Sequence, residues 1–174
     1  DQALKVQRVL NPDDKEKICD LLLDPGYALI HAGEPRHAVD VEAPTALSVA
    51  EAMSDTARAA RACILAIEAL TWYGWTAIWL APEYAQWAER ADRYAGPETV
   101  ERARADSFMA NVKYATGHPG EGLALRRQAL DLARRLGDAE TFWEVAGWRI
   151  FRVTEPHYPE EQLLLAEEML KGSR

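Results

Sequence analysis

The sequence predicts an all-α protein, a right-handed α-solenoid of about four antiparallel helix pairs. Apolar residues recur at steps of three and four along most of the chain, which is the spacing of one face of a helix. Similar helical segments return about every 40 residues, and no useful length of chain alternates between apolar and polar residues as a half-buried strand does. One helix pair cannot bury its own apolar stripe, so we expect the pairs to stack around a continuous core.

The clearest helix pair lies at about 98–116 and 119–136, with a tight turn at Gly117 between its helices. Small residues stand where these two helices must approach closely: Ala110, Gly122 and Ala129. The second helix has an apolar stripe on one side and a polar, arginine-rich face on the other. The stripe consists of Leu125, Ala129, Leu132, Ala133 and Leu136, and the polar face of Arg126, Arg127, Asp131, Arg134 and Arg135.

Proline and capping residues divide the rest of the chain into further helices. We expect Asp13 or Asp14 to cap the first long helix and Asp55 to cap a later one. Pro25 and Pro44 fall inside helical patterns, so a kink or a break is expected at each. The expected helices span about 13–32, 36–53, 56–73, 82–95, 98–116, 119–136, 139–154 and 159–171.

Residues 1–12 end in Asn11-Pro12 and are expected to be a connector or the end of a preceding domain. Residues 13–174 then form the helical repeat domain. Three helices inside it end in similar phrases, which begin at residues 46, 87 and 129, and a weaker copy occupies 163–170. The turn at 32–38 also matches the turn at 116–122, because five residues separate the glycine from the next small residue in both.

The pair at 110–136 resembles a tetratricopeptide repeat. The first pair matches less fully, and the second matches only through its helices, because residues 75–81 are inserted at its turn. The long period and the repeated phrases are similar to the helical segments that follow the ATPase module in bacterial LuxR/MalT-like regulators and adenylate/guanylate cyclases. The matching residues are Ala110, Tyr114, Gly117, Gly122 and Ala129-Leu130 in the clearest pair, and Gly26, Gly33, Ala38 and Ala46 in the first.

Composition excludes several classes of function. Hydrophobic residues make up 48% of the chain and charged residues 28%, as in an ordinary globular domain. The net charge of −8 argues against direct nucleic-acid binding, and the arginine-rich face at 126–135 is interpreted as a solvated helix face. No run of 18 apolar residues predicts a membrane span. Cys19 and Cys63 have no metal-site spacing and are interpreted as buried thiols, which favours the cytoplasm.

No sequence motif for catalysis or nucleotide binding is present, so we expect no catalytic residue, cofactor or metal in this segment. An ATPase or cyclase of the parent protein would lie outside these residues. The four histidines, at 31, 37, 118 and 157, fall near expected turns, and no two have the three- or four-residue spacing of metal ligands on a helix.

Aromatic residues concentrate at 72–87, and two interpretations of this insert stay open. In the first, the insert folds over the second repeat and fills the core. In the second, Trp75 and Trp79 form an interface, and the domain is a structural homo-oligomerisation domain. Tryptophan and tyrosine serve both roles well, since they bury large areas and also anchor binding sites.

The tetratricopeptide resemblance implies a concave groove lined by the first helix of each pair. By register, it implies groove residues for a protein, a peptide or a small polar ligand. The sequence therefore predicts a non-catalytic binding domain, the sensor or regulatory module of a larger bacterial signalling protein. The implied groove residues are Arg61, Glu68 and Trp72, then Arg104, Asn111 and Tyr114, and last Glu144, Trp148 and Arg152.

Overall fold

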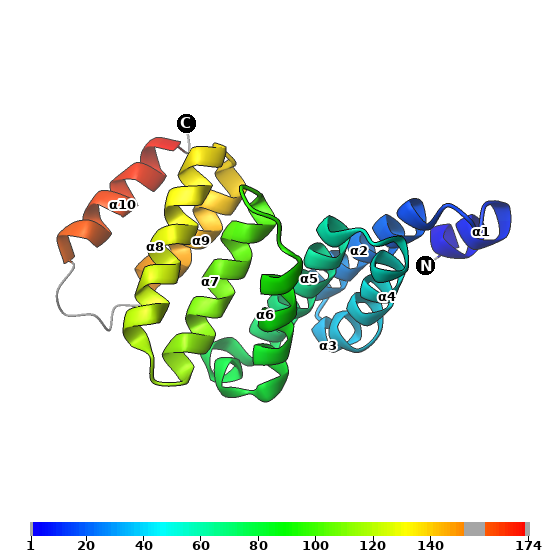
Figure 1. Ribbon diagram of the computed structural model, residues 1–174, viewed down its shortest axis with the longest axis horizontal. Helices are drawn as coiled ribbons and strands as arrows, with labels where there is room; N and C mark the ends of the chain where they lie inside the picture. The colour runs from blue at the N-terminus through cyan, green and yellow to red at the C-terminus, as the bar shows by residue number, and fades with distance from the viewer. Residues whose placement is uncertain (1, 152–158, 173–174) are drawn as a thin grey trace.

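A computed structural model describes residues 2–151 and 159–172, and every regular element in these ranges is helical (Figure 1). The predicted all-α class is therefore confirmed. The helices are α1 (Gln2–Leu10), α2 (Lys15–His31), α3 (Pro35–His37), α4 (Ala43–Met53), α5 (Thr56–Gly74), α6 (Pro82–Tyr94), α7 (Val100–Ala115), α8 (Pro119–Leu136), α9 (Ala139–Phe151) and α10 (Pro159–Gly172), with a π-helical segment η1 (Ala38–Glu42) and a 3-10 helix η2 (Trp75–Leu80).

The helices pack in the order of the chain, from α1 at one end of the molecule to α10 at the other (Figure 1). In addition, α2 contacts α5, α5 contacts α7, and α7 contacts α9. The helices between them behave differently: within the described residues, α4 makes no such contact with α6, nor α6 with α8. Helices α2, α5, α7 and α9 therefore form one closely packed layer, while α4, α6 and α8 lie farther from one another.

Two turns have the same backbone geometry, as the matching sequence phrases predict. Gly33 and Gly117 have φ values of 85° and 82°, a left-handed conformation that glycine adopts without steric cost. The Glu34 amide donates to the carbonyl oxygen of Leu29 at 2.9 Å, and the His118 amide donates to the carbonyl oxygen of Lys113 at 2.8 Å. Pro35 and Pro119 then open the next helix, where a missing N–H is harmless.

The two internal prolines are accommodated in different ways. The expected break at Pro25 is absent, because α2 continues through it as one helix whose apolar face is buried. Pro44 follows the wide turn η1, in which the amide of Ala43 donates to the carbonyl of Ala38. A π turn of this kind lets α4 begin with Pro44 in its first turn, so no backbone hydrogen bond is lost there. The irregularity expected at Pro44 is thus confirmed.

Helix α5 is the most enclosed helix of the fold, and it contacts α2, α4, α6 and α7. Between residues 59 and 70 every residue is buried except Arg61 and Glu68. Asp55 caps its first turn as predicted, accepting from the Arg58 amide at 3.0 Å. Arg58 also ion-pairs with Asp20 on α2 at 3.0 Å, which fixes α2 against α5.

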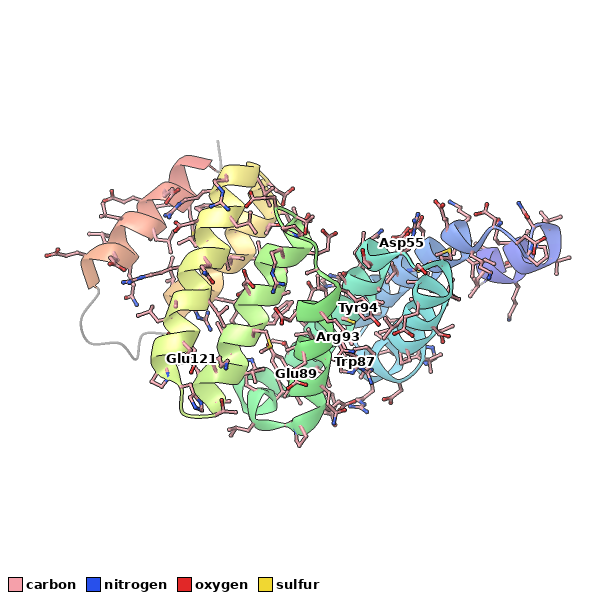
Figure 2. The ribbon with its side chains drawn as sticks, viewed as in Figure 1. Asp55, Trp87, Glu89, Arg93, Tyr94 and Glu121 are labelled. Atoms are coloured by element: carbon pink, nitrogen blue, oxygen red, sulfur yellow. The ribbon has the colours of Figure 1, made fainter. Side chains whose placement is uncertain are left out.

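A side-chain hydrogen bond joins α4 and α6, whose backbones do not come into close contact. The Tyr94 hydroxyl of α6 donates to Glu51 of α4 at 2.6 Å, and Tyr94 lies on the side of α6 that faces the viewer (Figure 2).

Cys19 and Cys63 are fully buried free thiols, as predicted. Burial raises the pKa of Cys63 to about 12, so this thiol stays protonated and unreactive at neutral pH.

The contact between α7 and α8 confirms the role of the small residues. Ala110 and Ala129 are completely buried. A Cβ atom added to Gly122 would lie 3.0 Å from the carbonyl oxygen of Ala110 and 2.9 Å from the ring of Tyr114. Because the nearest backbone atom cannot move without moving α7, only glycine permits this approach.

Gly122→Leu should lower the free energy of unfolding by about 2–3 kcal/mol, because the new side chain forces α7 and α8 apart. Urea denaturation followed by circular dichroism measures the change. Gly120→Ala is the matched control, since a Cβ atom there meets nothing within 4 Å. The control should stabilise α8 by up to about 1 kcal/mol. Equal effects of the two substitutions would contradict the close α7–α8 contact.

Candidate functional site

A cavity of about 1120 Å³ lies among α2, α5, α7 and α9, the layer in which α2 contacts α5, α5 contacts α7, and α7 contacts α9. Its size suits a small organic molecule or a few residues of a peptide. Each of these four helices is the first of its pair along the chain. This is the face on which the tetratricopeptide resemblance places a groove.

One face of α5 forms part of the cavity wall. Arg61, Ile64, Glu68 and Trp72 line it, and they follow one another at steps of three and four residues. The rest of α5 is covered by neighbouring helices, as described above. Arg61 and Glu68, the two polar residues in the buried stretch of α5, therefore meet solvent at the cavity.

Most of the predicted groove residues meet at this cavity, although their role in binding stays a prediction. Three exceptions exist. Asn111 and Tyr114 are not among the residues that line it, and Arg152 lies outside the described residues. The predicted residues that line the cavity are Arg61, Glu68, Trp72, Arg104, Glu144 and Trp148.

The prediction for Asn111 is wrong, because this residue is buried with 1% of its surface exposed. On α7 the cavity lining ends at Phe108, and η2 packs against the same helix. Asn111 instead donates to the Tyr84 hydroxyl at 2.9 Å and accepts a hydrogen bond from Arg126. It joins α6, α7 and α8 from within.

Arg126 also departs from its expected place on the solvated face of α8. It is buried, and it donates to the carbonyl oxygen of Trp148 at 3.0 Å, while its guanidinium lies 5.3 Å from the ring centre of Tyr114. A buried guanidinium is tolerable when hydrogen bonds replace its hydration. The signal was present in the sequence, since Arg126 stands four residues from both Gly122 and Leu130, on the helix face that packs.

The aromatic insert is divided between core and cavity. Trp79 is buried at 6% exposure, and its ring meets Trp148 edge to face at 5.9 Å. The structure therefore places Trp79 in the core, the first of the two open interpretations, because η2 folds inward. Trp72 is 59% exposed at the cavity and meets the His31 ring at 5.8 Å. The side chain of Trp75 lies outside the described part of the structure.

Arg104 is the centre of charge in the cavity, and three carboxylates surround it. The Nε atom lies 2.8 Å from Glu144 Oε2. The Nη2 atom lies 3.4 Å from Glu140, and Nη1 lies 3.8 Å from Glu68. One guanidinium therefore faces three acidic groups that come from α5 and α9.

Burial and this crowding change the ionisation of two carboxyl groups. Desolvation, helped by the charge of Glu144, raises the pKa of Glu68 to about 8, although Arg104 opposes the shift. Desolvation also raises the pKa of Glu144, against the attraction of Arg104. Glu68 keeps 26% of its side-chain surface exposed, so it is recessed in the wall yet open to a ligand. It can give or accept a proton near neutral pH, and it can anchor a hydrogen-bond donor.

Several lining residues were not predicted. Tyr27 and His31 come from α2, Phe108 from α7, and Trp143 and Gly147 from α9. Tyr27 and His31 are four residues apart, so the sequence places them on one helix face. A kink or break at Pro25 would change the direction of that face, so the sequence did not predict where the two side chains lie. Desolvation, helped by Glu68, raises the pKa of Tyr27 well above its usual value.

Comparisons with protein-family models, with curated proteins and with solved structures each find no match for this chain. Within residues 2–151 and 159–172, no group of three or more histidine, cysteine or acidic side chains is placed to hold a metal ion. Of the helices described, none has the length and apolar character that crossing a bilayer requires.

Glu68→Gln should stabilise the protein at alkaline pH. A raised carboxyl pKa means that the folded state binds the proton more tightly than the unfolded state, so this contribution to stability is complete below pH 4.5 and is lost as pH rises through about 8. Glutamine keeps the neutral form at every pH. The variant should match wild type near pH 4.5 and exceed it by about 1–3 kcal/mol at pH 9, measured by urea denaturation.

Glu89→Gln provides the control for this experiment, because Glu89 is exposed on α6, away from the cavity (Figure 2). It makes the same chemical change without touching the cavity. If the two variants shift stability alike across the pH range, Glu68 is not the buried acid described above.

Proposed function

We propose that this chain is a non-catalytic binding module of tetratricopeptide type, a right-handed α-solenoid that holds a ligand in the cavity among α2, α5, α7 and α9. The observation that supports it is the position of the cavity. All four helices that line it are first helices of their pairs, and the concave side of a solenoid is lined in this way. The repeated turns at Gly33 and Gly117 support the same repeat.

The cavity has the composition of a binding site. Apolar and aromatic side chains make up much of its lining, and a few charged groups converge at Arg104. Binding pockets combine these features, because the apolar part supplies free energy and the polar groups fix orientation. A small molecule or a short peptide with one polar end fits this arrangement better than a flat protein surface does.

We further propose that the module senses its ligand for a larger bacterial signalling protein, a transcriptional regulator or a nucleotide cyclase. The support is the resemblance of the repeated helical phrases to segments of such proteins. Ligand binding would act by holding α2, α5, α7 and α9 together. Any neighbouring domain attached to this stack would then respond to its rigidity.

Gly147→Leu tests the cavity as the ligand site. Gly147 lines the cavity from α9, and a Cβ atom there meets nothing within 4 Å, so a larger side chain can start into open space at the cavity. The fold should be retained, with a gain of up to about 1 kcal/mol from helix propensity. A library of metabolites and short peptides is screened on wild type by melting temperature and tryptophan fluorescence. Each hit should lose at least about tenfold in affinity in the variant.

Gly120→Leu is the control, because it adds the same side chain to another glycine whose surroundings are open. Hits should bind this control and wild type equally. Ligands that bind wild type and Gly147→Leu with the same affinity would place the site elsewhere and refute the proposal.

A further inference from the structure

We propose that the cavity selects an organic cation, an ammonium or guanidinium group carried on an apolar or aromatic body, with Glu68 as its anionic anchor. This inference deepens the proposed function and depends on it. Three independent features of the cavity support it: an acid without a hydrogen bond, a surplus of negative charge, and an aromatic lining.

Within the described residues, the one ion pair of Glu68 is its long contact with Arg104. Glu68 and Arg61 are the two residues that interrupt an otherwise buried stretch of α5. Among the described residues, no hydrogen bond reaches its carboxylate, and its nearest cation is Arg104 Nη1 at 3.8 Å, beyond hydrogen-bond distance. A donor group on a ligand would supply the missing interaction.

The charge around the cavity is already unbalanced toward carboxylates. Arg104 is shared by three acids, as described above. Arg61 is also engaged, since it lies 3.5 Å from Asp20 and 4.0 Å from Asp24 on α2. A bound anion would therefore meet arginines that have partners and acids that repel it, whereas a bound cation would restore neutrality.

The lining around Glu68 suits an organic cation rather than a metal ion. Tyr27, Phe108, Trp72, Trp143 and Trp148 line the cavity. Aromatic rings attract cations and stack on flat or apolar groups. A bare metal ion would be repelled by the Arg104 guanidinium, which already occupies the space between the carboxylates of Glu68 and Glu144.

Binding should release a proton. The raised pKa of Glu68 keeps part of the population protonated at neutral pH, and the carboxyl must lose that proton to solvent before it can pair with a cation. The charged or titratable groups around it are Arg61 on its own helix, Tyr27 and His31 on α2, Glu101 and Arg104 on α7, and Glu140, Glu144 and the preceding Asp138 at α9.

The first experiment uses benzylguanidinium, which donates hydrogen bonds and keeps its positive charge from pH 6 to pH 8, and measures its affinity by calorimetry. Its neutral isostere benzylurea and the anion 3-phenylpropionate have similar bodies without the positive charge. The cation should bind at least about tenfold more tightly than either at pH 8, and its affinity should rise by up to about fiftyfold from pH 6 to pH 8, since the ionised fraction of Glu68 rises by that factor when its pKa is about 8. Tighter binding of the anion or of the neutral isostere would overturn the inference.

Glu68→Gln separates Glu68 from the other titratable groups. The variant should lose about tenfold or more of the affinity for the cation at pH 8, and its affinity should no longer change with pH. Glu89→Gln, which removes one charge from the outer side of α6, should bind as wild type does. An unchanged pH slope in Glu68→Gln would assign the dependence to another group and would overturn the role of Glu68.

Two sources of the cation remain to be separated: a free amine, or an arginine side chain of a peptide. Tryptamine and a blocked Trp-Arg dipeptide represent them, and tighter binding of either, lost in Glu68→Gln, supports the inference. Failure of the proposed function has a different signature. If the inference alone is wrong, neutral or anionic compounds bind and lose affinity in Gly147→Leu, whereas if the cavity is not a site, no compound responds to that substitution.

Discussion

The enclosure of α5 is the constraint on which the rest of the fold depends. Helices α2, α4, α6 and α7 all contact it, so it must be narrow enough for them to approach and apolar enough to be buried on every side except the face that lines the cavity. Five alanines between residues 59 and 69 satisfy both demands. A helix covered in this way holds its neighbours in fixed positions, and the layer formed by α2, α5, α7 and α9 follows from it.

Two arginines show what the fold does with buried charge. Arg126 lies in the core, where Asn111 and the carbonyl oxygen of Trp148 accept its hydrogen bonds and lock α7, α8 and α9 together. Arg104 lies at the cavity and faces three carboxylates, whose negative charge one guanidinium cannot neutralise. The first arrangement is structural, since its hydrogen bonds join helices. The second leaves Glu68 in need of a donor, which is why the cavity, rather than the core, is the place to look for function.

The aromatic residues support the same division of the molecule. Trp79 of η2 and Tyr84 and Trp87 of α6 are buried in the core. Trp72 and Trp148 line the cavity itself, and the contact of Trp148 with Trp79 joins the two sets. A lining supported from behind by a packed core loses less conformational entropy when a ligand binds.

The sequence by itself determined the helical class, most helix boundaries, the left-handed turns at Gly33 and Gly117, and the close contact at Gly122. These features depend on interactions within a few residues of the chain, such as caps, proline geometry and helical spacing, and each leaves a local pattern. Only the tertiary structure decided that Asn111 is buried, that Trp79 turns inward, and that Glu68 meets Arg104. The physical reason is that burial depends on what a distant helix places against a side chain, and no local pattern records it.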